Sequence, residues 1–215
     1  MQNLRIAILS YRSAPYGGGQ GIYVHDISKA LAKRGHKVDI ISGPPYPKVP
    51  EGIKLIQLPG LDLFQTFSFK ERIKIFKRKK NKDLSNYFEF WSVLFGGFPE
   101  MKTFGYRCQK YLSENTNYDI IIDNQSLSYG MLNIQKCMPF IEVIHHPITK
   151  DYKHDLLASN KLLYRFSRYR WYSFLKMQKK VAPSIKNIIT PSFNSLKDIA
   201  KDFKCNKSNI TVIHN

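Results

Sequence analysis

The feature that most restricts the fold of this chain is a regular alternation of short apolar runs with helix-like patterns. The runs are rich in Val and Ile, which favour strands, and helix-spaced apolar residues such as Tyr23, Ile27 and Leu31 lie between most of them. The seven predicted strands are Leu4–Leu9, Lys37–Ser42, Ile53–Leu58, Asp119–Ile122, Phe140–Ile144, Asn187–Thr190 and Ile210–Ile213. Apolar strands that alternate with helices predict an α/β fold: a Rossmann-like, doubly wound, mostly parallel sheet with helices on both faces.

Residues 61–99 interrupt this alternation. They contain a basic segment with helical spacing, followed by an aromatic cluster of Tyr87, Phe88, Phe90, Trp91 and Phe95. A chain of 215 residues is long enough to bury one sizeable core. We therefore predict a single domain over residues 1–215, with a helical, basic and aromatic insertion at about residues 61–99.

The net charge of the chain indicates an anionic partner. Lys and Arg number 34 against 16 Asp and Glu, which gives a formal charge of +18 at pH 7. Residues 69–82 hold eight basic residues and one acid, and residues 161–186 hold eight basic residues and no acid. The charge is accompanied by no helix-turn-helix, RNP or zinc-finger pattern, which argues against nucleic acid. The classes of anionic partner that remain are a phosphorylated substrate and an anionic membrane.

The first basic window has the pattern of a helix that lies in a membrane interface. Phe69, Ile73 and Phe76 share one helical face, and Lys and Arg occupy the rest. The residues predicted to face the membrane are Lys77, Arg78, Lys79 and Lys80. The alternative is a solvated basic face whose apolar stripe packs on the domain.

Ligands of a doubly wound sheet bind beyond the carboxyl ends of its strands, so we searched the segments that follow them. After the first strand comes Tyr16–Gly21, where glycines allow the backbone to approach a phosphate at a helix N-terminus. This segment is not a full dinucleotide fingerprint, because Val24 occupies the third glycine position, and it is not a P-loop. A tight turn without a ligand is the alternative.

Histidine and amide side chains follow two later strands. His145 and His146 come after the fifth strand, where an imidazole can hydrogen-bond a substrate oxygen; a packed or capping histidine is the alternative. Asn124 follows the fourth strand and can bind a sugar hydroxyl, whereas the nearby Ser126 is equally suited to cap a helix. Adjacent histidines on an extended chain point in opposite directions, and no carboxylate pair lies at ligand spacing nearby. We therefore predict no metal site.

Cysteine usage and the amino-terminal sequence indicate a reducing compartment. The three cysteines are odd in number and far apart, which excludes a disulfide framework and a paired zinc motif. The sequence has no run of about 18 apolar residues, and an alternating strand begins where a signal peptide would lie. We expect a cytoplasmic protein, placed peripherally on the inner face of the plasma membrane through its basic helix.

Five stretches of the sequence form a recognisable set. The first is G-G-G-Q-G-I-Y-V-x-x-I-x-x-A-L-A-x-R-G-H-x-V at Gly17–Val38. The others are Y-D-I-I-I-D-N-Q-S-L-S-Y-G at Tyr118–Gly130, V-I-H-H-P-I-T at Val143–Thr149, R-W-Y-S-F-L-K-M-Q at Arg170–Gln178 and I-T-P-S-F-N-S at Ile189–Ser195. Together they resemble the amino-terminal half of glycosyltransferase family 4 enzymes, which have the GT-B fold, and the resemblance covers nearly the whole chain.

The resemblance implies a retaining glycosyltransferase that transfers a sugar from a nucleotide-diphosphate sugar to a hydroxyl acceptor and requires no metal cofactor. Gly18 and Gly19 match the paired glycines of a loop that approaches the donor diphosphate. His145 matches a histidine that contacts the transferred sugar or a donor phosphate, and we expect it to be catalytic. We assign Asn124 and His146 to acceptor binding.

The end of the sequence adds one expectation. Val212–Asn215 resembles the start of the family's interdomain linker, after which a nucleotide-sugar-binding carboxyl-terminal domain would follow. That domain is absent from this sequence, so we expect the chain to be inactive until the domain is supplied in cis or in trans. Membrane binding would place the site near a lipid-linked acceptor. The alternatives are a non-catalytic module that retains the fold and docks on membranes or a partner, and a nucleotide-binding regulator.

Overall fold

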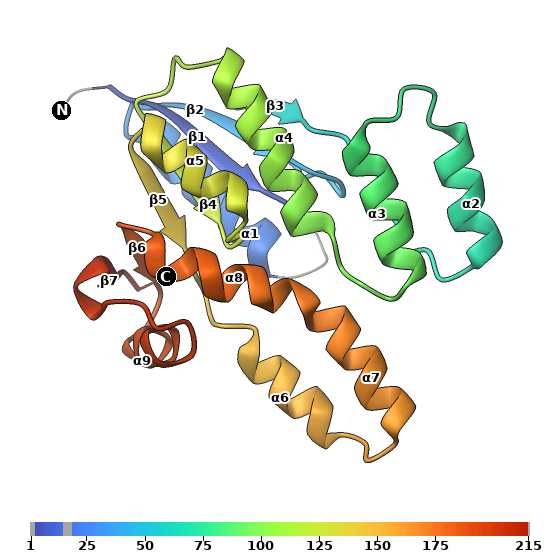
Figure 1. Ribbon diagram of the computed structural model, residues 1–215. Helices are drawn as coiled ribbons and strands as arrows, with labels where there is room; N and C mark the ends of the chain where they lie inside the picture. The colour runs from blue at the N-terminus through green and yellow to red at the C-terminus, as the bar shows by residue number, and fades with distance from the viewer. Residues whose placement is uncertain (1–2, 15–18, 215) are drawn as a thin grey trace.

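The computed structural model of the chain describes residues 3–14 and 19–214. Its centre is a sheet of seven parallel strands in the order β3-β2-β1-β4-β5-β6-β7 (Figure 1). The strands are β1 (Arg5–Ser10), β2 (Lys37–Ser42), β3 (Lys54–Gln57), β4 (Ile120–Asn124), β5 (Phe140–Val143), β6 (Ile188–Thr190) and β7 (Ile210–Val212). The predicted fold class is confirmed, and each strand agrees with its predicted range to within two residues.

Helices connect the strands and cover both faces of the sheet. The helices are α1 (Gly19–Lys33), α2 (Phe69–Arg78), α3 (Leu84–Leu94), α4 (Glu100–Glu114), α5 (Tyr129–Cys137), α6 (Thr149–Leu157), α7 (Leu162–Trp171), α8 (Leu175–Val181) and α9 (Phe193–Asp202), with 3₁₀ turns η1 (Tyr172–Phe174), η2 (Ala182–Ser184) and η3 (Lys207–Asn209). Helix α1 packs on one face, and α4, α5 and α8 lie on the other (Figure 1). This division follows from right-handed crossovers, because the chain leaves β1 in one direction and β4 in the other.

The larger core lies between the sheet and α4, α5 and α8. Within it, α4 and α5 approach each other at two glycines, Gly105 and Gly130. A Cβ added to Gly130 would lie 2.1 Å from the carbonyl oxygen of Gly105, which is closer than real Cβ contacts. The absence of a side chain at Gly130 therefore sets how closely these helices pack.

Helices α2 and α3 form a pair beside the β3 edge of the sheet (Figure 1). The sequence placed Phe69, Ile73 and Phe76 on one face of this helix and left two alternatives for it, a membrane interface or packing on the domain; for Ile73 and Phe76 the structure shows packing. Ile73 and Phe76 pack in a small core with α3, where the ring of Phe76 stacks on that of Phe90 with centroids 4.2 Å apart. Phe69 alone is exposed, at 60%. The apolar face of α2 is covered mainly by α3 because a paired helix buries apolar area without a membrane.

A buried carboxylate fastens this helix pair to α4. Glu89 of α3 accepts hydrogen bonds from the backbone N–H of Leu61 (2.9 Å), from Oγ1 of Thr103 (2.6 Å) and from Nη1 of Arg107 (2.6 Å). A buried carboxylate is stable only when it is paired and hydrogen-bonded in this way. The polar network therefore fixes the position of α3 against α4.

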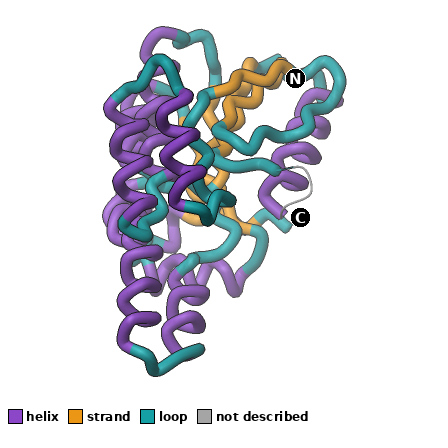
Figure 2. Tube along the Cα trace, turned by 90° about the vertical axis from the view of Figure 1, so that its right-hand side faces the viewer, coloured by secondary structure: helices purple, strands orange, loops and turns teal. Residues whose placement is uncertain are grey.

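Helices α6 and α7 form a hairpin that extends away from the sheet, with the turn between them at its far end (Figures 1 and 2). On the inner side of the hairpin, Asp155 of α6 accepts a hydrogen bond from the hydroxyl of Tyr172 at 3.0 Å and lies 3.6 Å from Nη1 of Arg168. These contacts hold α6 against the carboxyl-terminal end of α7. None of the residues of α7 is fully buried.

Candidate active site

The candidate site lies where the strand order changes direction. The chain continues from β1 to β2 on one side and from β4 to β5 on the other, so the carboxyl ends of β1 and β4 flank the point where open α/β sheets bind ligands. Asn124 ends β4, and His145 follows β5. Helix α1 begins at Gly19 on the same edge. The structure thus brings together three of the segments that the sequence singled out.

The imidazole of His145 is held between two neighbours. Its Nε2 lies 2.8 Å from Oδ1 of Asn124, and its ring meets the ring of Tyr23 edge to face, with centroids 4.7 Å apart. Burial lowers the pKa of His145, and the nearby His146 lowers it further. The ring is therefore neutral at neutral pH. Tyr23 is a contact that the sequence reasoning missed, although its place in the first turns of α1 was a usable signal.

The side chain of Gln125 fixes the backbone after β5. Its Oε1 accepts a hydrogen bond from the backbone N–H of His145 at 2.9 Å, and its Nε2 donates to the carbonyl oxygen of His146 at 3.0 Å. Gln125 is buried and has a φ of 61°, in the left-handed region that a non-glycine residue adopts at a cost. This clamp ties the segment after β4 to the segment after β5, and no motif in the sequence indicates it.

Asp123 supports the turn that carries Gln125. Its Oδ2 accepts hydrogen bonds from the backbone N–H and the hydroxyl of Ser126, at 2.8 and 2.7 Å. Of the alternatives for Ser126, helix capping is wrong, because its hydroxyl turns back to Asp123 and α5 begins three residues later, at Tyr129. Polar side chains that bond their own turn in this way compete with capping.

Asp123 and Glu142 form a buried pair of carboxyl groups beneath the site. The two residues are register partners across β4 and β5, and both are fully buried. Burial raises the pKa of each; for Asp123, the interaction with the Glu142 carboxyl group opposes the rise most, followed by the hydrogen bonds from Ser126 and Leu127. The charge of Asp123 raises the pKa of Glu142 further. The pKa of Glu142 is raised the further of the two, so Glu142 is the carboxyl group that binds a proton more readily.

The glycine segment lies only partly within the described residues. Gly18, predicted to face the donor phosphate, lies outside them. Gly19 is exposed and is the first residue of α1, so the helix begins inside the glycine segment and not after Gly21; the role of Gly19 toward a donor phosphate stays a prediction. A Cβ on Gly21 would lie 2.5 Å from the carbonyl oxygen of Ala14, so a glycine is needed there to let α1 start beside β1. No residue of the first turn of α1 is acidic.

His146 has a different environment from His145. It is exposed, and its Nε2 lies 3.3 Å from Oδ2 of Asp151 at the start of α6. The assignment of His146 and Asn124 to acceptor binding stays a prediction. The basic residues Lys77, Arg78, Lys79 and Lys80 lie at the end of α2 and just beyond it, on the helix pair beside β3 and not at the carboxyl ends of β4 and β5.

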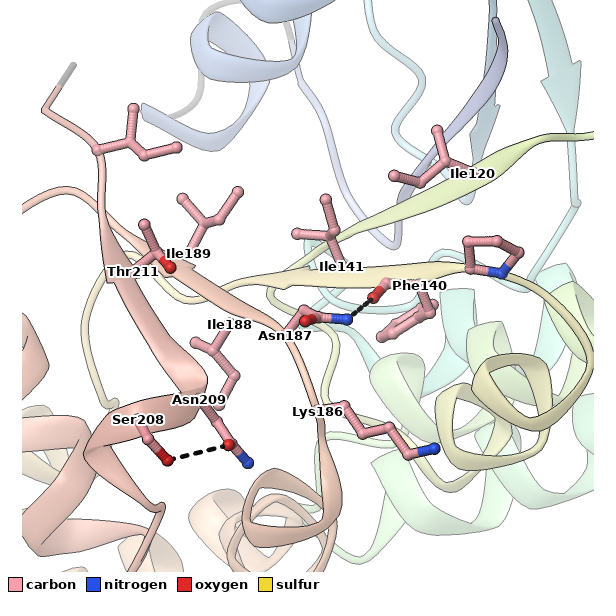
Figure 3. Close-up of a pocket in the computed structure, with 12 residues that line it drawn as sticks. Ile120, Phe140, Ile141, Lys186, Asn187, Ile188, Ile189, Ser208, Asn209 and Thr211 are labelled. Atoms are coloured by element: carbon pink, nitrogen blue, oxygen red, sulfur yellow. Dashed lines mark hydrogen bonds between the residues drawn. The ribbon is translucent and has the colours of Figure 1, made fainter.

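The hollow drawn in Figure 3 is separate from this site. It has a volume of about 350 Å³ and is lined by the beginnings of β5 and β6, including Phe140, Asn187 and Ile189. Its polar groups bond one another, as when Nδ2 of Asn187 donates to the carbonyl oxygen of Phe140 at 3.3 Å. It contains no histidine or carboxylate, so it lacks the side chains of a reactive site.

Within residues 3–14 and 19–214, no group of three or more His, Cys, Asp or Glu side chains is arranged to hold a metal ion. The two histidines at the candidate site are His145 and His146. As expected for adjacent residues, they have different neighbours, Asn124 for one and Asp151 for the other. The expectation that no metal cofactor is needed stays a prediction.

A parallel seven-stranded sheet, with a glycine at the start of the first helix and a histidine after β5, defines a Rossmann-like domain of the kind found in GT-B glycosyltransferases. The sequence model of Glycosyltransferase Family 4 matches residues 17–215. The chain belongs to this family.

Individual relatives agree with this assignment. The chain is 38% identical to the MMP alpha-(1->4)-mannosyltransferase of Mycolicibacterium hassiacum, a match that covers 98% of the chain and 51% of that protein. The chain thus spans about half the length of this curated relative.

Two solved structures share the fold. WaaG, a glycosyltransferase involved in lipopolysaccharide biosynthesis, is 15% identical with a TM-score of 0.54, and the match covers 97% of this chain and 44% of WaaG. The catalytic domain of starch synthase IV from Arabidopsis thaliana, bound to ADP and acarbose, is 13% identical with a TM-score of 0.56, and the match covers 100% of this chain and 52% of that one. At these identities, the two structures establish the fold alone.

Proposed function

We propose that this chain is the acceptor-side half of a retaining glycosyltransferase that transfers a mannosyl unit from a nucleotide-diphosphate sugar to a hydroxyl acceptor. The observation that carries the proposal is the neutral, hydrogen-bonded imidazole of His145, held against Tyr23 in the first turns of α1. Family membership supports the reaction class. The mannosyltransferase of M. hassiacum supports the choice of sugar.

The first turn of α1 would bind the leaving diphosphate. Cleavage of the bond between sugar and phosphate leaves negative charge on the diphosphate, which must be stabilised by groups already in place. The free N–H groups of a helix N-terminus and the positive end of its dipole supply such stabilisation. Because the first turn of α1 contains no acid, no side-chain charge there opposes the anion.

His145 would contact the transferred sugar. With Oδ1 of Asn124 facing Nε2, we assign the proton of the neutral ring to Nε2, so Nδ1 is left as an acceptor. An acceptor nitrogen can receive a hydrogen bond from a sugar hydroxyl but cannot donate one to a phosphate. The protonation state of His145 therefore favours the sugar over the donor phosphate.

The rest of the site would come from a carboxyl-terminal half, supplied in cis or in trans. The relative named above is about twice as long as the matched region, so its site has further residues to draw on. Closure of two halves would exclude water and align the acceptor with the donor. We propose that residues 1–215 alone do not transfer sugar, and that the complete enzyme needs no metal.

We propose further that the acceptor is lipid-linked and that the enzyme works in the cytoplasm, on the inner face of the plasma membrane. The two basic windows, with sixteen basic residues between them, support attraction to an anionic surface. Among the described residues, no helix combines the length and the apolar character needed to cross a membrane.

The test is sugar transfer by a longer protein that contains this sequence, or by this chain combined with a carboxyl-terminal half. We expect release of nucleoside diphosphate and a labelled product when a nucleotide-diphosphate mannose is given with mannoside or lipid-linked acceptors. Proton NMR of the product should show the anomeric configuration of the donor. His145→Ala should strongly slow transfer, whereas His154→Ala, at an exposed histidine of α6, should not. Absence of transfer from every nucleotide sugar tried would overturn the proposal.

A further inference from the structure

We infer that the outer faces of α3 and α7 form one membrane-docking surface for anionic lipid, in place of the end of α2 that the sequence indicated. This inference rests on the membrane step of the proposed function and names the surface that performs it. It starts from apolar residues that the fold leaves in solvent. Contiguous exposed apolar surface of this kind marks an interaction site in a folded protein.

The first part of the surface is a helical stripe on α3. Leu84, Phe88, Trp91 and Phe95 recur at intervals of four and three residues, so they share one face of the helix. All four are exposed, with Trp91 at 54% and Phe95 at 60%. The opposite side of α3 carries Phe90 and Val93, which pack in the core with α2. Helix α3 is therefore apolar on its outer face as well as its inner one.

The second part lies on α7 and continues to the turn of the hairpin. Leu162 and Leu163, where α7 begins, are exposed at 83% and 86%, and Leu157 at the end of α6 is exposed at 81%. These leucines lie at the end of a hairpin that extends beyond the rest of the domain (Figures 1 and 2). Phe166 follows Leu162 by one turn and is exposed at 58%.

Arg170 joins the two parts. Its guanidinium carbon lies 5.4 Å from the ring centroid of Phe95 on α3 and 5.6 Å from that of Phe166 on α7. Lys102 of α4 is placed similarly, with Nζ 4.3 Å from the ring centroid of Phe88. Cations over aromatic rings keep their charge available on the same surface as the apolar groups.

The charge of this surface selects the partner. The one acid of α3, Glu89, is buried and paired with Arg107, and α7 has no acid. Asp155 of α6 faces Arg168 and Tyr172 on the inner side of the hairpin. The surface therefore presents Lys and Arg among apolar side chains, with no acid contributed by either helix face. Such a surface matches an anionic lipid bilayer. The apolar side chains would enter the boundary between the lipid headgroups and the acyl chains, and the basic groups would lie level with the lipid phosphates.

The test is co-sedimentation of the chain with vesicles of phosphatidylcholine, with or without phosphatidylglycerol. Two double variants are compared. One carries Leu162→Ser and Leu163→Ser, and the other carries Phe67→Ser and Phe69→Ser. Both double variants remove two exposed apolar side chains and no charge; the second pair lies at the start of α2. We expect binding to the mixed vesicles only. The leucine pair should lower the partition coefficient by at least about tenfold, and the phenylalanine pair should change it less than about twofold.

A second readout follows Trp91, one of two tryptophans in the chain. In a Trp171→Phe background, emission of Trp91 should shift to shorter wavelength and become protected from acrylamide on mixed vesicles. Loss of binding in the phenylalanine pair but not in the leucine pair would overturn the assignment to α3 and α7 and return docking to α2. Equal binding to neutral vesicles would overturn the role of charge. No binding at low salt would overturn docking itself, while the glycosyl-transfer assay tests the reaction independently.

Discussion

Gln125 holds the backbone of His145 from the neighbouring strand, through a hydrogen bond of 2.9 Å from the His145 N–H to its Oε1. The second hydrogen bond of the same carboxamide reaches the carbonyl oxygen of His146 at 3.0 Å. The segment after β5 is thus fixed by a side chain whose own backbone, at a φ of 61°, is in a conformation that costs free energy. The two hydrogen bonds offset that cost, and they set where the imidazole lies relative to Asn124.

Gln125→Met should release this clamp without changing the size of the side chain. Loss of two partly buried hydrogen bonds should lower the free energy of unfolding by roughly 2 kcal/mol. The ring of His145 should also lose its fixed contact with Asn124. Nitrogen chemical shifts of His145 should then move toward a mixture of its two neutral tautomers.

Gln135→Met is the matched control for this prediction. Gln135 of α5 makes an equivalent pair of backbone hydrogen bonds, to the carbonyl oxygen of Ser184 at 2.8 Å and from the N–H of Lys186 at 3.0 Å. Because these two hydrogen bonds are exposed to solvent, Gln135→Met should lower stability by less, and it should leave the His145 signals unchanged. Unchanged His145 signals in Gln125→Met as well would show that the clamp does not position the imidazole.

His145→Ala should reduce kcat in the complete enzyme more than it raises KM. The reason is that a contact to the sugar which strengthens as the bond to phosphate breaks acts mainly in the transition state. His146→Ala should have a smaller effect, because that ring is exposed and faces Asp151. Steady-state kinetics of both variants checks the prediction. Turnover within about twofold of the parent for His145→Ala, together with loss of activity in His146→Ala, would reverse the two assignments.

The strands were predictable from sequence because each is a local run of β-branched residues, and His145 was predictable because it directly follows such a run. Gln125 was not, since its role requires the pairing of β4 with β5 and a positive φ that glutamine rarely adopts. The burial of Phe76 was one of two alternatives, and the sequence could not decide between them. Helical spacing identifies an apolar face but not its partner, which in this fold is Phe90 of α3.

Glu142→Gln should make the protein more stable above weakly acidic pH. The pKa of Glu142 is raised by burial and by the charge of Asp123, so the folded state keeps a proton that the unfolded chain releases. For a raised pKa, the contribution to stability is full below the ordinary glutamate pKa of about 4.3 and declines as pH rises toward the folded value. Glutamine cannot lose that proton and is close in shape.

Urea unfolding at about pH 5 and about pH 8 checks this expectation. The gain in free energy of unfolding from Glu142→Gln should be larger at the higher pH. Glu114→Gln, at an exposed residue of α4, serves as the control and should give no pH-dependent gain. A loss of stability at both pH values in Glu142→Gln would show that Glu142 is charged in the folded protein.

Gly130→Ala should destabilise the packing of α4 against α5. The new Cβ would lie 2.1 Å from the carbonyl oxygen of Gly105, a backbone atom that moves only if the helices separate. Overpacking of this kind costs about 1–3 kcal/mol, so we expect a loss near the upper end. Gly19→Ala is the control, because within the described residues nothing lies within 4 Å of a Cβ there. Equal melting temperatures for Gly130→Ala and the parent would contradict the packing described above.

Residues 1–215 expressed alone should fold and yet transfer no sugar. The described residues form a seven-stranded sheet, and α4, α5 and α8 bury a sizeable core against it, so cooperative unfolding by circular dichroism is expected. Transfer should fail because the first turn of α1 and His145 meet the donor from one side only, and charge on a departing diphosphate needs donors arranged around it. The measurement is release of nucleoside diphosphate from a panel of nucleotide sugars, by the chain alone and after addition of a carboxyl-terminal half. Sugar transfer by the chain alone would show that the site described here is sufficient, and would remove the proposed need for a second half.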